Sequence, residues 1–224
     1  MGDMRDRLMV ALDVADRRAA LTLRDQLGDS VGWFKIGLRL FVAEGVRLVA
    51  EMQHSHRIFL DLKFHDIPNT VAQAVGSAGD LGVDMVNVHA AGGEVMLRAA
   101  AEAAAPFSQL QLIAVTVLTS DPMPPERARS LAVERAQMSC DAGLSGVVCS
   151  VHEVAAIKSV CGDSCLTVTP GIRMRGGATD DQMRVADPAT AIAAGADYLV
   201  VGRPVLHSEQ PRTAVQQLLA AMGA

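Results

Sequence analysis

Short apolar runs recur along the chain at a nearly regular interval, and each is apolar almost throughout rather than at every second position. Strands that are buried on both faces show this pattern, which is typical of parallel sheets. The pattern predicts eight strands, at residues 8–14, 33–38, 57–63, 85–90, 112–118, 146–150, 166–171 and 198–202.

The segments between these runs have the apolar spacing of helices, and several end at a glycine, as helices often do. The clearest span residues 17–28, 38–52, 69–82, 94–105 and 124–143. Strands that alternate with helices predict βαβ units. Eight such units in 224 residues fit a closed (β/α)8 TIM barrel of the α/β class.

The alternative fold is an open, doubly wound sheet. It is less favoured because the nucleotide fingerprint G-x-G-x-x-G is missing after the first strand, where ALDVADRRA stands instead. The segment DPMPPE at 121–126 is too short for a domain boundary, and nothing else resembles a linker. We therefore expect a single barrel domain over residues 1–224.

Composition narrows the class of protein. Half of the residues are apolar and only 3% are aromatic, so the core is expected to be aliphatic. The net charge of −5 argues against a nucleic-acid-binding protein, which is normally basic. It leaves room for an anionic small ligand in a local positive pocket. With no apolar run of roughly 18 residues and no signal peptide at its start, the chain is predicted to be cytoplasmic and not membrane-bound.

The cysteines do not predict a metal site. The chain has four of them, without a C-x-x-C pair or a neighbouring histidine that would complete a zinc set: Cys140, Cys149, Cys161 and Cys165. A structural role for reduced thiols is the expectation.

The residues at and just after the carboxyl ends of the predicted strands, where the active sites of (β/α)8 barrels lie, are mostly polar. They are Asp13, Lys35, Asp61, Lys63, Asp66, Asn87, His89, Thr119, Ser120, Pro170, Gly171, Arg173, Gly202 and Arg203. Charges therefore converge on one rim of an otherwise apolar barrel.

Asp61 and Lys63 are two residues apart on a strand, so both point toward the barrel axis if Leu62 packs outward. A carboxylate and an ammonium about 4 Å apart attract by about 4 kcal/mol at an effective dielectric of about 20. This attraction favours a protonated Lys63, which suits a proton donor. An ionised Asp61 would repel a carboxylate on a substrate, and loss of that carboxylate as carbon dioxide would relieve the repulsion. The pair predicts a cofactor-free decarboxylation.

A simpler interpretation is a strand-end ion pair, with Asp66 capping the next helix. It is less favoured because Asp13 and Lys35 are predicted on the same rim. His89 is interpreted mainly as hydrogen-bonded support rather than as an acid or base, and His65 as a loop residue.

A second constellation lies at the ends of the last two strands, in GIRMRGGATDDQMR and VVGRP. Barrels commonly hold a phosphate there, on backbone N–H groups and a helix N-terminus. Gly202 lets the backbone approach an anion, and Arg203 offers a charged fork, with Arg173, Arg175 and Arg184 nearby. The segment RGGATDDQ is typical of a loop that closes over a ligand; the alternative is a solvated turn.

The decapeptide DLKFHDIPNT at 61–70 resembles the signature of the orotidine 5′-phosphate decarboxylase family. The resemblance covers the whole chain, because ALDV, FKIG, VNVHAAGG, VTVLTS, TPGIR, DDQ and VVGRP occur in the family's order. It implies a homodimer of (β/α)8 barrels that converts orotidine 5′-monophosphate to uridine 5′-monophosphate and carbon dioxide. This reaction is the last step of de novo pyrimidine synthesis and uses no metal or organic cofactor.

The resemblance also implies roles for single residues. Lys63 would protonate C6 and Asp61 would lie against the substrate carboxylate, in an alternating charge network completed by Lys35 and by Asp66 of the other subunit. Asp13 and Lys35 would bind the ribose hydroxyls, together with Thr70 from the partner chain, and Ile67 would line the space around the leaving carbon dioxide. Thr119 or Ser120 would contact the pyrimidine. Pro170 and Arg173 would begin the closing loop, and the phosphate would be bound by Gln182, Gly202 and Arg203.

Two alternatives stay open. The pattern D-x-K-x-x-D also resembles related magnesium-dependent barrels, 3-keto-L-gulonate-6-phosphate decarboxylase and the aldolase hexulose-6-phosphate synthase. These need an acidic ligand on the second strand, where this chain has Lys35. A barrel that only binds a phosphate ligand is disfavoured because Asp61, Lys63 and Asp66 are all present.

Overall fold

The computed structural model describes residues 3–118, 120–174 and 186–223. Its eight strands form a closed parallel barrel in which each strand pairs with the next and the last pairs with the first. They are β1 (Leu8–Ala11), β2 (Trp33–Gly37), β3 (Arg57–Phe64), β4 (Met85–His89), β5 (Gln111–Val115), β6 (Gly146–Val148), β7 (Leu166–Thr169) and β8 (Tyr198–Val201). The predicted (β/α)8 TIM barrel is confirmed.

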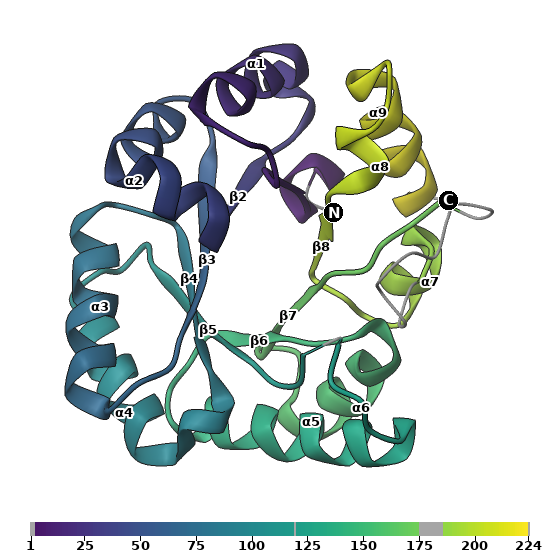
Figure 1. Ribbon diagram of the computed structural model, residues 1–224. Coiled ribbons are helices and arrows are strands. Elements are labelled where there is room, and N and C mark those ends of the chain that lie inside the picture. The colour runs from purple at the N-terminus through teal and green to yellow at the C-terminus, as the bar shows by residue number, and fades with distance from the viewer. Residues whose placement is uncertain (1–2, 119, 175–185, 224) are drawn as a thin grey trace.

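The helices surround this ring of strands (Figure 1). They are α1 (Arg17–Leu27), α2 (Leu38–Gln53), α3 (Pro68–Asp80), α4 (Gly93–Ala104), α5 (Pro125–Asp141), α6 (Val151–Cys161), α7 (Pro188–Ala193), α8 (Arg203–Leu206) and α9 (Pro211–Met222). Short 3-10 helices occupy Met4–Arg7, Gly28–Ser30 and Ala90–Gly92. Each helix predicted above is present, although α2 is interrupted at Gly45, whose φ of 62° departs from the helix. No helix in the described part of the chain is long and apolar enough to span a membrane.

Several strands end earlier than their apolar runs. β1 ends at Ala11 instead of residue 14, and β5 ends at Val115 instead of residue 118. The apolar residues beyond these ends belong to the segments that lead away from the barrel. Asp13 therefore lies in the segment after β1 and not on the strand itself.

The core has two layers, because successive side chains of a strand point to opposite faces. Outward side chains pack against the helices in a layer that is almost entirely aliphatic. Inward side chains fill the barrel with a smaller cluster: Met9, Ala11, Trp33, Phe59, Met85, Ile113, Val168 and Val200. Two of the few aromatic residues, Trp33 and Phe59, thus lie in the barrel interior.

The same two-residue period leads from this apolar interior to the polar rim. Trp33 is followed inward by Lys35, Phe59 by Asp61, and Met85 by Asn87. Each of these strands therefore uses one inward position to fill the barrel and the next to present a polar group.

Candidate active site

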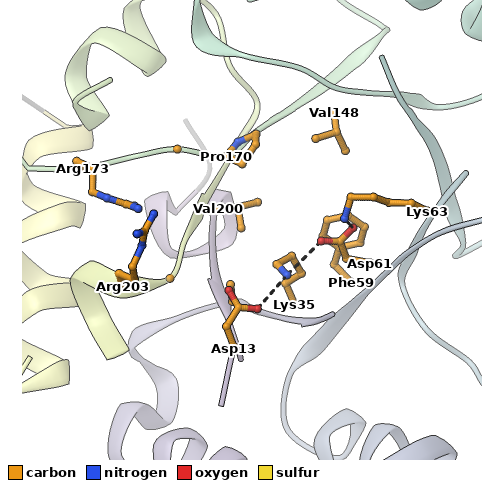
Figure 2. A pocket seen from close by; sticks show the side chains of 13 residues that line it. Asp13, Lys35, Phe59, Asp61, Lys63, Val148, Pro170, Arg173, Val200 and Arg203 are labelled. Atoms are coloured by element: carbon orange, nitrogen blue, oxygen red, sulfur yellow. Dashed lines mark hydrogen bonds and ion pairs between the residues drawn. The ribbon is translucent and has the colours of Figure 1, made fainter. Parts of the chain in front are cut away.

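A pocket opens at the carboxyl end of the barrel (Figure 2). Most residues predicted for the site line it, namely Asp13, Lys35, Asp61, Lys63, Pro170, Arg173, Gly202 and Arg203. Apolar residues of the barrel interior, such as Phe59, Val148 and Val200, form the rest of its lining. The pocket therefore combines charged groups with an apolar floor.

Four charged side chains from three neighbouring segments form a chain of alternating sign (Figure 2). The Lys35 Nζ atom lies 3.6 Å from Asp13 Oδ1 and 3.1 Å from Asp61 Oδ2. The Lys63 Nζ atom donates to Asp61 Oδ1 at 2.5 Å. The predicted contact between Asp61 and Lys63 is confirmed, and Leu62 packs toward the outer core as expected.

Burial and pairing fix the charges of the central pair. Burial alone would favour the neutral form of each group, but the neighbouring charges outweigh it. Despite burial, the ammonium groups of Lys35 and Lys63 hold the pKa of Asp61 below its usual range. Likewise, Asp61 and Asp13 raise the pKa of Lys35, which is only 9% exposed. Asp61 is therefore ionised, and Lys35 is protonated, at neutral pH.

Glycine at position 37 leaves space for this arrangement. A Cβ atom there would lie 3.2 Å from Lys35 Nζ and 3.6 Å from Asp13 Oδ1. The first distance is tighter than ordinary van der Waals contact, so a larger residue would press on the buried ammonium.

The backbone at Lys63 departs from a regular strand. Its φ is +52°, which makes it the one non-glycine residue of positive φ in the described part of the chain. The pairing of β3 with β4 shifts register between Leu60 and Phe64. Regular alternation, the basis of the sequence prediction, is therefore wrong for Lys63, although the contact that it predicted is present. A side chain of this size occupies that region only when its surroundings hold it there.

Asn87, on β4, holds both members of the pair. Its Oδ1 accepts a hydrogen bond from the backbone N–H of Lys63 at 2.7 Å, and its Nδ2 donates to Asp61 Oδ1 at 2.7 Å. The side chain is fully buried. The sequence placed Asn87 at a strand end but gave it no role. A lone amide at an inward position within the run MVNVHA was the available signal.

On the opposite side of the pocket, the side chains of Arg173 and Arg203 point toward one another (Figure 2). Arg173 follows Gly171, whose φ is +80°, and its backbone N–H donates to the carbonyl of Ala186 at 2.9 Å. Arg203 is the first residue of α8, and only Gly202 separates it from the end of β8. Two cations and two glycines thus face the acidic and basic groups across the pocket. The predicted residues Arg175, Gln182 and Arg184 lie outside the described residues.

Asp66, Ile67 and Thr70 do not line the pocket of the single chain and are exposed instead. They follow β3, where the chain turns over the rim into α3, and Asp66 Oδ1 accepts from the backbone N–H of Ile67 at 2.6 Å. Ile67 is 66% exposed, which is unusual for an isoleucine. Thr119 lies outside the described residues, and Ser120 is an exposed residue of the turn.

His89 is held in the way the sequence favoured. Its Nδ1 accepts from the backbone N–H of Ala91 at 3.1 Å, and its ring stacks on His65 with centroids 5.4 Å apart. Burial, reinforced by His65, lowers the pKa of His89. The ring is therefore a neutral acceptor at neutral pH.

Comparison with known proteins decides the family. The model of the orotidine 5′-phosphate decarboxylase / HUMPS family matches residues 6–218. The chain belongs to this family. The resemblance of DLKFHDIPNT to the family signature is thereby confirmed, and the matched residues include every residue that lines the pocket.

Three curated relatives carry the same name. An orotidine 5′-phosphate decarboxylase from Carboxydothermus hydrogenoformans is 44% identical, over 98% of this chain and 97% of its own length. Proteins of the same name from Dichelobacter nodosus and Alkalilimnicola ehrlichii are 46% and 48% identical, over 96% and 95% of this chain and 98% and 94% of their own lengths.

Solved structures agree in fold. The crystal structure of orotidine 5′-phosphate decarboxylase from Lactobacillus acidophilus has a TM-score of 0.84 at 32% identity, covering 98% of this chain and all of that one. An uncharacterized conserved protein from Geobacillus kaustophilus has a TM-score of 0.80 at 33% identity, covering 96% of this chain and 99% of its own.

Proposed function

We propose that the protein decarboxylates orotidine 5′-monophosphate to uridine 5′-monophosphate and carbon dioxide, as the last step of pyrimidine synthesis. The observation that carries the proposal is the ionised carboxylate of Asp61, held between Lys35 and Lys63 on the wall of the pocket. The relatives' shared name supports this substrate over other phosphorylated compounds.

The proposed chemistry uses the two charges of the pair in turn. The substrate carboxylate lies beside Asp61, and the two like charges repel each other. When the bond to the carboxylate breaks, carbon dioxide leaves and the electron pair stays on C6 of the pyrimidine. The Lys63 ammonium then stabilises this carbanion and donates a proton to it, which gives the product. Only interactions stronger in the transition state accelerate the step, so relief of repulsion and proton donation both contribute.

The opposite side of the pocket fits the 5′-phosphate of the proposed substrate. Arg173 and Arg203 offer guanidinium groups, and each such group can bind two phosphate oxygens at once. Only Gly202 separates the end of β8 from the short helix α8, and barrels often bind phosphate at this place. Gly202 lets the backbone come close to the anion. Between the two ends, Asp13 and Lys35 would hold the ribose hydroxyls, with Pro170 at the start of the segment leading to Arg173.

The contact of Thr119 with the pyrimidine and that of Gln182 with the phosphate stay predictions, as does a cytoplasmic location.

The reaction is proposed to need no metal. Within the described residues, the rim carboxylates Asp13 and Asp61 are both paired with Lys35, a cation at the position where a metal ligand would have to stand. The magnesium-dependent sugar-phosphate enzymes are the second candidate, and the position of Lys35 disfavours them.

The functional test is an assay with purified protein, orotidine 5′-monophosphate and excess chelator, followed by loss of substrate absorbance. Chelator-resistant formation of uridine 5′-monophosphate supports the proposal. If turnover appears only with added magnesium and a sugar phosphate, the second candidate is correct.

Lys63→Ala tests the assigned proton donor. It should abolish measurable turnover while product binding, measured by calorimetry, persists, because Lys63 acts mainly in the transition state. Lys63→Arg is the matched control, since it keeps the positive charge beside Asp61 but holds its proton too tightly to donate it. Near-normal turnover in either variant contradicts the assignment.

The active form is proposed to be a homodimer in which each pocket is completed by the second copy. Exposed apolar residues gather on α2 and at the start of α3, namely Leu38, Val42, Val46 and Ile67, which are 54%, 80%, 53% and 66% exposed. These two helices follow the neighbouring strands that carry Lys35 and Asp61. Asp66 and Thr70 flank Ile67 and are exposed as well. A second copy would bury the apolar side chains and bring this carboxylate to its partner's pocket.

Mixing two inactive variants tests the shared pocket. Lys63→Ala and Asp66→Ala each impair both sites of their own dimer. In an equal mixture that reassorts freely, half of the dimers are mixed and each has one intact site, so about a quarter of wild-type activity returns. Two results contradict a shared pocket. One is that no activity returns although subunit exchange has been verified. The other is that light scattering shows the fully active wild-type protein to be a monomer.

A further inference from the structure

Three cysteines converge at the end of the barrel opposite the pocket. Cys140 lies in the last turn of α5, Cys161 ends α6, and Cys165 immediately precedes β7. Because the helices run antiparallel to the strands, these positions all lie at the amino-terminal end of the barrel. The two helices lie next to each other in Figure 1. The fold thus brings Cys140 to the close pair Cys161 and Cys165, although it lies 25 residues before Cys165 in the chain.

The sulfur atoms are close enough to share one metal ion. Their Sγ atoms all lie within 4.8 Å of one another, and those of Cys140 and Cys165 are 2.7 Å apart. All three are free thiols. Two sulfurs bound to one zinc ion at about 2.3 Å each are at most about 4.6 Å apart. Small side-chain rotations would therefore place all three at bonding distance from a common centre.

We propose that Cys140, Cys161 and Cys165 form a binding site for one thiophilic divalent metal ion of the zinc class. Thiolate ligands select such soft ions over magnesium or calcium. Cys140 and Cys161 are only partly buried, so an ion can enter from solvent. This site departs from the sequence expectation that the cysteines have a structural role without metal.

The surroundings supply a candidate for the fourth ligand. The side-chain oxygen of Gln137 lies 3.9 Å from Cys161 Sγ, and its amide nitrogen donates to Asp141 Oδ1 at 2.9 Å. The hydrogen bond orients the amide with its oxygen toward the sulfurs. That oxygen, or a water molecule bound to it, can complete the four-coordinate geometry that zinc prefers.

The proposed ion has a structural effect. It would tie together the ends of α5 and α6 and the start of β7, which belong to consecutive units of the barrel. Because the folded chain holds the three thiols together and the unfolded chain does not, the ion should bind the folded state more tightly and so raise stability. It lies at the other end of the barrel from the pocket, so turnover should be the same with and without it.

A titration with cadmium, which binds thiolates and absorbs in the ultraviolet when it does, tests the site. The full chain is kept reduced with a phosphine that does not bind the metal. We expect sulfur-to-cadmium absorption that saturates at one ion per chain, and competition by zinc. Cys161→Ser should weaken binding by more than about 100-fold, the upper end of what losing an outer partner alone costs. Cys149→Ala, which changes the fourth cysteine, should leave binding unchanged.

Alkylation of the wild-type protein gives a second measurement that does not depend on variant folding. Zinc should protect Cys140 and Cys161 from iodoacetamide, as mapped by mass spectrometry. The proposal is overturned if cadmium produces no charge-transfer absorption, or if the absorption survives in Cys161→Ser. It is also overturned if zinc gives no protection, or if the protein prepared without reductant holds a Cys140–Cys165 disulfide that reductant does not open.

Discussion

Asn87→Ala removes a side chain that bonds both the backbone of Lys63 and the carboxylate of Asp61. The hydrogen bond to the ionised Asp61 is worth about 1.5–3 kcal/mol, and the neutral one from Lys63 about 1 kcal/mol. Alanine also leaves the Lys63 N–H without its partner and a small void at a fully buried position. We therefore expect the free energy of unfolding to fall by about 2–4 kcal/mol.

The same change should reduce turnover more than binding. The left-handed backbone of Lys63 costs about 1–3 kcal/mol and persists only while its surroundings hold it. Without Asn87, that backbone can relax and carry the ammonium away from its position. A displacement of about 1 Å costs on the order of 100-fold in rate. We expect kcat to fall by about 10- to 100-fold, with a KM change of less than about threefold.

Steady-state kinetics and urea unfolding measure the two effects. Thr116→Val is the matched control, because it removes a buried hydrogen bond to the carbonyl of Val148 at the same end of the barrel. It leaves the charged side chains Asp13, Lys35, Asp61 and Lys63 in place. It should cost about 1 kcal/mol of stability and leave kcat unchanged. The positioning argument fails if Asn87→Ala keeps kcat within a factor of two, or if Thr116→Val lowers kcat equally.

Two further predictions follow from the pocket. Arg203→Ala should raise KM and lower kcat/KM by about 10- to 150-fold, which corresponds to the loss of one charged hydrogen bond of about 1.5–3 kcal/mol. Arg212→Ala, at an exposed position, is the control. An unchanged kcat/KM in Arg203→Ala would place the phosphate elsewhere. Asp61→Asn should be less stable than the wild type above about pH 4, where Asp61 is ionised in both folded and unfolded states, and this difference should shrink as pH falls through the lowered pKa of the folded state. Urea unfolding of both proteins at pH 7 and pH 3 measures this difference in the free energy of unfolding. If the difference is the same at both pH values, the assigned ion pairs are contradicted.

Sequence reasoning located the rim because strand periodicity is local. Lys35 and Asp61 each follow an apolar inward residue by two positions, and no tertiary information is needed to see that they share its direction. The same local rule was wrong for the backbone of Lys63, because the left-handed turn there depends on a hydrogen bond that its N–H donates to a side chain of a different strand. Asn87 was missed as a partner for the same reason. Its contact with Asp61 depends on the register of β3 against β4, which pairs Phe59 with Met85.

The cysteine cluster shows a second limit of local patterns. Cys140 lies 25 residues from Cys165, yet their sulfur atoms are in contact because α5 ends and β7 begins at the same edge of the barrel. A search for closely spaced ligands excludes such a group, whereas the barrel topology allows it. Comparing the residues at the carboxyl ends of successive helices, as was done for successive strands, would have identified these cysteines.

The decapeptide at 61–70 divides between two surfaces. Asp61 and Lys63 line the pocket, whereas Asp66, Ile67 and Thr70 are exposed, because the chain turns over the rim between Phe64 and Pro68. One folded chain explains the first group but not an exposed isoleucine beside an exposed carboxylate. The proposed second copy would account for both, since its interface would bury the isoleucine and bring the carboxylate to the edge of a pocket rich in cations. The fold of a single chain therefore explains where the pocket lies, and the exposed half of the decapeptide supports the proposal that a second copy completes it.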